Sequence, residues 1–199
     1  MHISDHYPEG TVRALLNTDH ITEATRQALT ERISFPSRQP QFFSDEEYAL
    51  LQAICDRLIP QQDRPQYIDL AGGIDERLTK NMSNGWRYDV MPPDRDSFKL
   101  GLKGVSETAI ALFQQPFQQL STEQQDNVLM AIQLAEVEGG IWDALPAERF
   151  FEELLTEAVE NYYSHPLSME EIGCVSMADR PGWQRIGLNQ LDDREPRPL

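Results

Sequence analysis

Residues 43–59 read FSDEEYALLQAICDRLI and carry the strongest structural signal in the chain. Ser44 followed three residues later by Glu47 is a capping box, in which each side chain accepts the other residue's backbone N–H at a helix start. Four apolar or aromatic residues then recur at helical spacing: Tyr48, Leu51, Cys55 and Leu58. Because Pro60 cannot continue a helix, the stretch predicts an amphipathic helix that ends before it.

The same periodicity extends outward in both directions, and strand-like alternation is absent. Two short helices are expected within residues 10–34, the second capped by Thr22, and further helices are expected over 68–82, 97–113, 121–138 and 146–163. The sequence therefore predicts an all-α protein with a single compact helical domain of about five to seven helices. We expect an N-terminal helical arm over 1–41, the domain over 42–188 and a flexible, irregular C-terminal tail over 189–199.

Apolar stripes predict which faces of these helices are buried. In residues 121–138, Ser121 and Gln124 form a second capping box, and the expected core residues are Val128, Leu129, Ile132 and Ala135. In residues 146–163 the stripe is Phe150, Phe151, Leu154, Leu155, Ala158, Val159 and Tyr162. The acids of that helix are expected on its solvated face: Glu148, Glu152, Glu153, Glu157 and Glu160. Gly101 and Gly104 are expected to weaken the 97–113 helix, and a short turn capped by Ser168 to follow Pro166.

The net charge of −16 excludes whole classes of partner. Nucleic acid and anionic membrane surfaces are disfavoured because both require a clustered basic face. Between residues 121 and 171 there are twelve acidic residues and one basic residue, Arg149. The negative electrostatic field of this segment would attract a basic partner surface, or it serves only to keep the protein in solution; the sequence leaves both interpretations open. Residues 1–6 show no export signal, so a cytoplasmic location is expected, or a periplasmic one if a partner carries the chain across.

Motifs for cofactor or metal chemistry are missing from the sequence. It has no glycine-rich dinucleotide turn, no phosphate loop and no metal-ligand spacing, so no catalytic, cofactor-binding or metal-binding residue is predicted. The two cysteines, Cys55 and Cys174, are expected to be buried free thiols. His165 falls at the end of the 146–163 helix, where a helix C-terminus favours a positively charged cap.

Aromatic side chains outside helical stripes mark a candidate partner interface. Trp86, Tyr88, Tyr163 and Trp183 fall in loops or at helix ends, where they either cap the core or face a partner. We group them with His165 and Pro166 as candidate interface residues. Four of the six, Tyr163, His165, Pro166 and Trp183, are expected to hold the C-terminal tail on the helical body and to present it to a partner.

Four stretches give the chain a family resemblance. They are the helix from Phe43-Ser44 to Cys55-Asp56-Arg57-Leu58-Ile59-Pro60, the run Phe150-Phe151-Glu152-Glu153-Leu154-Leu155, the motif Tyr162-Tyr163-Ser164-His165-Pro166, and the motif Gly182-Trp183-Gln184-Arg185-Ile186-Gly187. Together they resemble gluconate 2-dehydrogenase subunit 3 and its wider family, over about residues 42–188.

The resemblance implies a noncatalytic accessory subunit of a membrane-associated dehydrogenase. In that family a large FAD-containing flavoprotein of the glucose–methanol–choline type oxidises a sugar, sugar acid or alcohol, and a cytochrome subunit often takes the electrons onward. The small subunit supports folding, export or stability of the large one. The alternative, from the residues themselves, is a self-sufficient enzyme or small-molecule binder that uses a His165/Tyr163 cleft.

Overall fold

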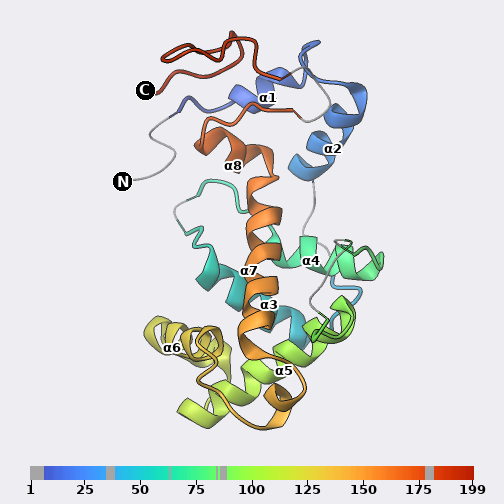
Figure 1. Ribbon diagram of the computed structural model, residues 1–199, viewed down its shortest axis with the longest axis vertical. Coiled ribbons are helices and arrows are strands. Elements are labelled where there is room, and N and C mark those ends of the chain that lie inside the picture. The colour runs from blue at the N-terminus through green and yellow to red at the C-terminus, as the bar shows by residue number, and fades with distance from the viewer. Residues whose placement is uncertain (1–6, 35–38, 63, 84, 86–88, 178–181) are drawn as a thin grey trace. The chain divides into compact units, whose positions relative to one another are not determined.

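The computed structural model describes residues 7–34, 39–62, 64–83, 85, 89–177 and 182–199. In these ranges the chain is helical and has no β-strand, which confirms the predicted all-α class (Figure 1). The α-helices are α1 (Thr11–Leu15), α2 (Glu23–Ile33), α3 (Asp45–Leu58), α4 (Leu70–Thr79), α5 (Asp94–Phe113), α6 (Thr122–Gln133), α7 (Ala147–Tyr163) and α8 (Pro166–Glu171), with short 3-10 helices η2 (Phe117–Gln119) and η3 (Gly140–Asp143).

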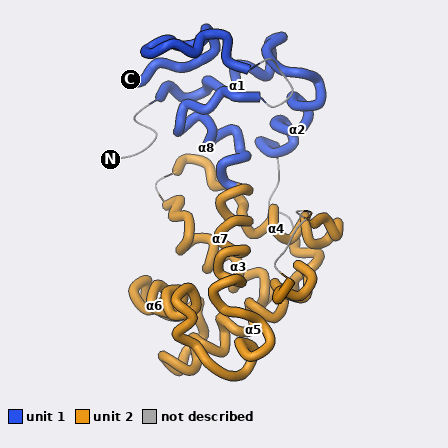
Figure 2. The backbone as a smooth tube through the Cα atoms, viewed as in Figure 1, with its two compact units in different colours: residues 1–36, 162–199 blue, residues 37–161 orange. Residues whose placement is uncertain are grey.

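The chain divides into two compact units, coloured separately in Figure 2. Unit 1 combines the two ends of the sequence, residues 1–36 and 162–199, and unit 2 is the continuous segment 37–161. Unit 1 thus contains α1, α2 and α8, and unit 2 contains α3 to α6 with most of α7. None of the helices in the described ranges is long and apolar enough to cross a membrane.

Helix α3 begins as the sequence predicts. The Ser44 hydroxyl accepts the Glu47 N–H at 3.2 Å, and the Glu47 carboxylate accepts the Ser44 N–H at 2.8 Å, so both halves of the capping box form. Leu51 and Cys55 are fully buried, as expected from the stripe. Leu58, the last residue of α3, is only half-buried, contrary to expectation.

The entry to α3 is fixed by a buried carboxylate on α4. Asp75 accepts the backbone N–H groups of Gln41, Phe42 and Phe43 at 2.8, 3.0 and 3.0 Å. Three otherwise unpaired donors are thereby satisfied by one side chain that is 5% exposed. Asp75 therefore joins α4 to the segment that precedes α3.

Helix α5 starts at Asp94, three residues before the predicted start, with Asp94 and Asp96 in its first turn, where the helix dipole favours acids. Its two glycines, expected to weaken it, are contact points. A Cβ at Gly101 would lie 2.0 Å from the Phe150 ring, and a Cβ at Gly104 would lie 2.5 Å from the Trp142 ring. The side chains of α7 and η3 therefore reach the α5 backbone only because these positions lack a Cβ.

Helix α6 ends at Gln133, five residues before the predicted end at Glu138. Ala135, expected on the core face, is exposed and has a left-handed backbone with φ 53°. The Glu136 N–H bonds the Ala131 carbonyl across it at 2.8 Å, which is the closing hydrogen bond of a Schellman motif. The capping box at Ser121 and Gln124 forms as predicted.

Helix α7 starts one residue after the predicted start, ends at the predicted residue and keeps most of the predicted stripe. Leu154 is buried, but Leu155 is half-buried and Val159 is 37% exposed, so the apolar stripe is wider than the buried face. Glu157, expected in solvent, is 2% exposed and bonds the guanidinium of Arg77 at 2.9 Å. This buried acid sits on the core side because α4 supplies a cation to meet it.

The Arg77 guanidinium also bonds the carboxylate of Asp94 at 2.7 Å, which links α4, α5 and α7. A third acid, Glu153, faces the same group. Partial burial raises the pKa of Glu153, and the charges of Asp94 and Glu157 raise it further. One guanidinium therefore balances a locally acidic cluster.

Candidate interface

His165 sits at the turn between α7 and α8, where it caps the helix that follows. Its Nδ1 accepts the Leu167 N–H at 3.2 Å, as an N-cap of α8. Its Nε2 lies 3.0 Å from the Arg32 carbonyl oxygen. A neutral ring that carries its proton on Nε2 satisfies both contacts. The predicted positively charged cap of the α7 C-terminus is therefore wrong, since the ring serves an α8 N-terminus, where a positive charge is unfavourable.

Pro166 occupies the first position of α8, where proline is well tolerated because the N–H it lacks has no helical partner. Ser168, expected to cap this turn, instead lies buried inside α8. Its hydroxyl bonds the backbone carbonyls of Tyr162 and His165. The chain between α7 and α8 is thus a closely bonded corner.

The first helix of the chain is fastened to α8 by a buried acid. The Glu170 carboxylate accepts the backbone N–H groups of Gly10 and Arg13 at 2.8 and 2.9 Å, and it also binds the Arg13 guanidinium. Burial alone would raise the pKa of Glu170, but these bonds outweigh it, so the pKa lies below its ordinary value. The carboxylate therefore stays ionised while it holds α1.

An apolar cluster fills the space between these elements of unit 1. Its buried members come from both ends of the sequence: Val12, Leu15, Ile21, Leu29, Met169, Val175 and Met177. At the other end of α8, the Arg32 guanidinium donates to the Ser164 carbonyl at 2.8 Å. The N-terminal helices and the α7–α8 corner therefore form one packed structure.

Of the candidate residues at this corner, Tyr163 is the exposed one. It is 43% exposed and packs edge-on against the Tyr162 ring, with centroids 5.0 Å apart. His165 and Pro166 are buried, so their side chains hold the corner and do not present a surface. The candidates Trp86 and Tyr88 lie outside the described residues.

Trp183 belongs to a separate structure, a closed loop of residues 183–195 that runs into the C-terminal tail. It is 40% exposed, and the Arg194 guanidinium lies over its ring at 4.8 Å from the centroid. The Asp192 carboxylate, 9% exposed, accepts the backbone N–H groups of Gln184 and Arg185 at 2.9 and 3.2 Å. The tail was expected to be irregular, and it has no helix, yet this carboxylate gives it a fixed local form.

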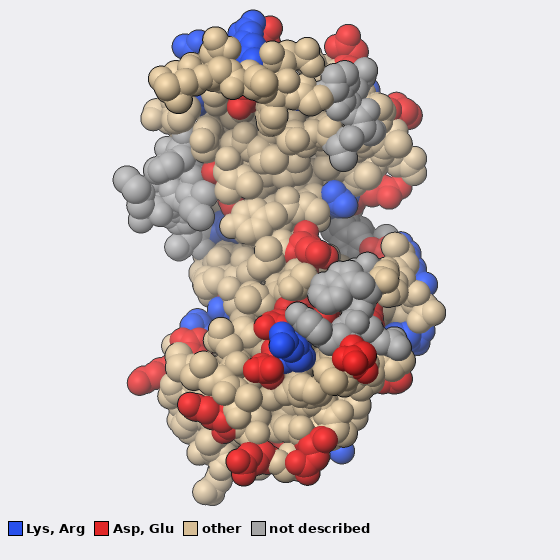
Figure 3. Space-filling view, in the orientation of Figure 1, with Lys and Arg blue, Asp and Glu red and all other residues tan. Residues whose placement is uncertain are grey.

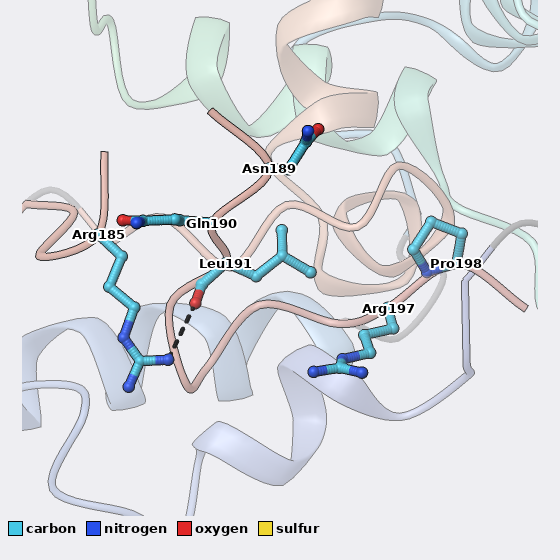
Figure 4. A pocket seen from close by; sticks show the side chains of 6 residues that line it. All are labelled: Arg185, Asn189, Gln190, Leu191, Arg197 and Pro198. Atoms are coloured by element: carbon cyan, nitrogen blue, oxygen red, sulfur yellow. Dashed lines mark hydrogen bonds between the residues drawn. The ribbon is translucent and has the colours of Figure 1, made fainter. Parts of the chain in front are cut away.

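A shallow pocket opens beside this loop (Figure 4). It is lined by Arg185, Asn189, Gln190, Leu191, Arg197 and Pro198. Figure 4 shows Arg185 turned toward the Leu191 carbonyl, which it bonds at 3.2 Å, and the same guanidinium pairs with Asp193 at 2.8 Å. These bonds tie the Arg185 side chain to the loop itself, so its charge is already balanced.

On the face shown in Figure 3, Asp and Glu side chains appear at many separate places. Within the described ranges, no three His, Cys, Asp or Glu side chains are grouped so that they could hold a metal ion. Cys55 and Cys174 are both free thiols, as predicted, although Cys174 is only half-buried.

Comparison with protein-family models places the chain in a known family. The family model for gluconate 2-dehydrogenase subunit 3 matches residues 45–188, from the start of α3 into the closed loop of the tail. Membership of such a family indicates an accessory subunit of a dehydrogenase complex. The chain belongs to the gluconate 2-dehydrogenase subunit 3 family. No curated protein and no solved structure was found to match it.

Proposed function

We propose that the chain is a noncatalytic accessory subunit of a flavin-dependent dehydrogenase of the glucose–methanol–choline type. It supports folding, stability or assembly of a large FAD-containing subunit that oxidises a sugar, sugar acid or alcohol. Any association with a cytochrome subunit would be indirect, through that flavoprotein. The observation that carries the proposal is the family match, which covers both the α7–α8 corner and the Trp183 motif.

The bonding of His165 supports this reading over the small-molecule alternative. Both ring nitrogens are engaged with backbone groups, one with Leu167 and one with Arg32. A general acid or base needs a ring nitrogen within reach of a substrate proton. In this geometry a catalytic ring would have to give up a helix cap or a contact with α2, so its role is structural.

The partner surface then comes from the exposed candidates, Tyr163 and Trp183, and Trp86 and Tyr88 are proposed as further contact residues. Tyrosine and tryptophan are enriched among residues that dominate binding energy, because each combines a large apolar area with a polar group. Buried His165 and Pro166 contribute by fixing the corner from which Tyr163 projects.

The proposal is tested by co-expression with a flavoprotein of this type encoded beside the chain. The expected result is a complex that copurifies, and a lower yield of FAD-loaded flavoprotein when the accessory chain is omitted. Trp183→Ala should weaken the complex by about 2 kcal/mol or more, as for an interface hot spot. Failure of the flavoprotein to copurify with the unaltered chain would contradict the proposal.

The same assay distinguishes the accessory role from the alternative, an enzyme that uses a His165/Tyr163 cleft. His165→Asn keeps an acceptor for the Leu167 N–H, since asparagine is a strong N-cap residue. We expect this variant to assemble and to give unchanged turnover per bound flavin. Normal assembly with abolished turnover would instead favour a catalytic His165.

A further inference from the structure

The closed loop of the tail presents two apolar side chains to solvent. Ile186 is 86% exposed and Leu188 is 93% exposed, which makes them the most exposed large apolar residues in the described ranges. The next most exposed is the C-terminal Leu199 at 81%, and Leu134, which caps the end of α6, is 57% exposed. We refer to Ile186 and Leu188 together as the apolar tip.

The apolar tip is held by the loop that carries it. Leu188 lies in a tight turn in which the Gln190 N–H bonds the Gly187 carbonyl at 3.1 Å, and Asn189 adopts a left-handed backbone with φ 58°. Asparagine is among the residues that tolerate this conformation best. The turn therefore suits its sequence, and Leu188 projects from a defined backbone.

Two side-chain contacts close the base of the same loop. The Asp192 carboxylate accepts the N–H groups of Gln184 and Arg185, the two residues that directly precede the apolar tip. Behind it, Arg194 covers Trp183. An ordered loop loses less conformational entropy on binding than a free tail does, so these contacts preorganise the apolar tip.

The formal charge of this segment is balanced, unlike that of the acidic region before it. Residues 182–199 hold three arginines and three acids, whereas residues 121–171 hold twelve acids and one arginine. Arg185 pairs with Asp193 within the loop. In a chain of net charge −16, this segment can meet a partner without adding to charge repulsion.

We propose that the apolar tip, Ile186 and Leu188, inserts into an apolar pocket on the large flavoprotein subunit. This inference rests on the proposed function. The flavoprotein is the occupant that the observations favour, because the family match runs through Ile186 and ends at Leu188, whereas residues 1–44 lie outside it. Trp183, whose ring lies under the Arg194 guanidinium, remains a contact residue beside the apolar tip, and Asp192 is a positioning residue.

The test compares two double variants of the full-length chain for binding to the purified flavoprotein subunit. Ile186→Ser/Leu188→Ser removes the apolar tip, and Met130→Ser/Leu134→Ser removes two exposed apolar residues from the C-terminal end of α6, one in its last turn and one at its C-cap, 52% and 57% exposed. We expect the Kd, measured by titration calorimetry, to rise at least 30-fold in the first variant and less than threefold in the second. Circular dichroism melting should show both variants folded, because neither pair is buried.

A third variant, Asp192→Ala, opens the base of the loop and leaves the apolar tip in place. We expect it to raise the Kd about tenfold, with a less favourable binding entropy, since the loop must then be ordered on binding. If the apolar-tip variant binds as tightly as the unaltered chain, this inference is overturned and the proposed function stands. If the unaltered chain does not bind, both are overturned.

Self-association is the competing use of the apolar tip. Sedimentation of the isolated chain should give a monomer, and the apolar-tip variant should sediment identically. A dimer that Ile186→Ser/Leu188→Ser dissociates would assign the apolar tip to a second copy of the chain and would overturn the inference.

Discussion

Replacing Gly101 by alanine tests the packing of α7 on α5. A Cβ there would lie 2.0, 2.2 and 2.3 Å from three ring carbons of Phe150. Carbon atoms in contact normally stand about 3.5–4.0 Å apart, so the ring would have to move by roughly 1.5 Å. Phe150 is fully buried and packs edge-on against Phe98, with centroids 6.1 Å apart, which leaves it little room.

The free-energy change has two opposing parts. Overpacking a buried site costs about 1–3 kcal/mol, and alanine gains about 1 kcal/mol over glycine in a helix interior. Because the clash is with a fully buried ring, we expect the upper part of the first range and a net loss of about 2 kcal/mol. Urea unfolding followed by circular dichroism measures this loss directly.

Gly104→Ala supplies a matched control on the same helix. Its Cβ would meet Trp142 at 2.5 Å, a half-buried side chain that has space to shift, although its indole N–H bonds the Thr108 hydroxyl at 3.0 Å. Gly104→Ala should therefore cost less than Gly101→Ala. Combining Gly101→Ala with Phe150→Leu should cost less than the sum of the two single changes. A Gly101→Ala protein as stable as the unaltered chain would refute this account of the interface.

Three further changes have defined outcomes. Ala135→Gly should raise the free energy of unfolding by about 1 kcal/mol in the same urea assay, because glycine adopts the left-handed conformation of this helix end without a Cβ penalty; a loss would contradict the Schellman geometry. Glu153→Gln should stabilise the chain at pH 7 and have little effect at pH 3, since a carboxyl with a raised pKa destabilises the fold only once pH rises high enough to ionise it; equal effects at both pH values would argue against repulsion from Asp94. In a native thiol titration, Cys174 should react well before Cys55, whose pKa is raised by burial, and Cys174→Ser should remove the fast phase.

The starts of α3 and α6 were predictable from sequence because their determinants are local. The pairs Ser44–Glu47 and Ser121–Gln124 each satisfy backbone donors within one turn, and both capping boxes form. The end of α6 was harder to predict. Ala135 continues the amphipathic pattern and has the highest helix propensity, yet the Schellman hydrogen bond ends α6 two residues before it.

Long-range partners explain the other differences. Glu157 follows Phe150 by seven residues, a spacing that places both on one helix face, so periodicity alone could have shown it facing the core. What periodicity cannot show is Arg77, eighty residues away, which makes burial of that carboxylate possible. Pro166 was read as a helix end although proline also favours the first position of a helix, and this ambiguity hid the capping role of His165.

The composition of unit 1 also sets an order of events during synthesis. Val12, Leu15 and Leu29 leave the ribosome early, but their packing partners Met169 and Val175 are made more than a hundred residues later. At about 5–20 residues per second, these apolar side chains wait on the order of ten seconds or more for a surface to cover them. Unit 2 is a continuous segment and can fold in that interval. The nascent N-terminus is therefore a natural client for a chaperone until the last part of the chain emerges.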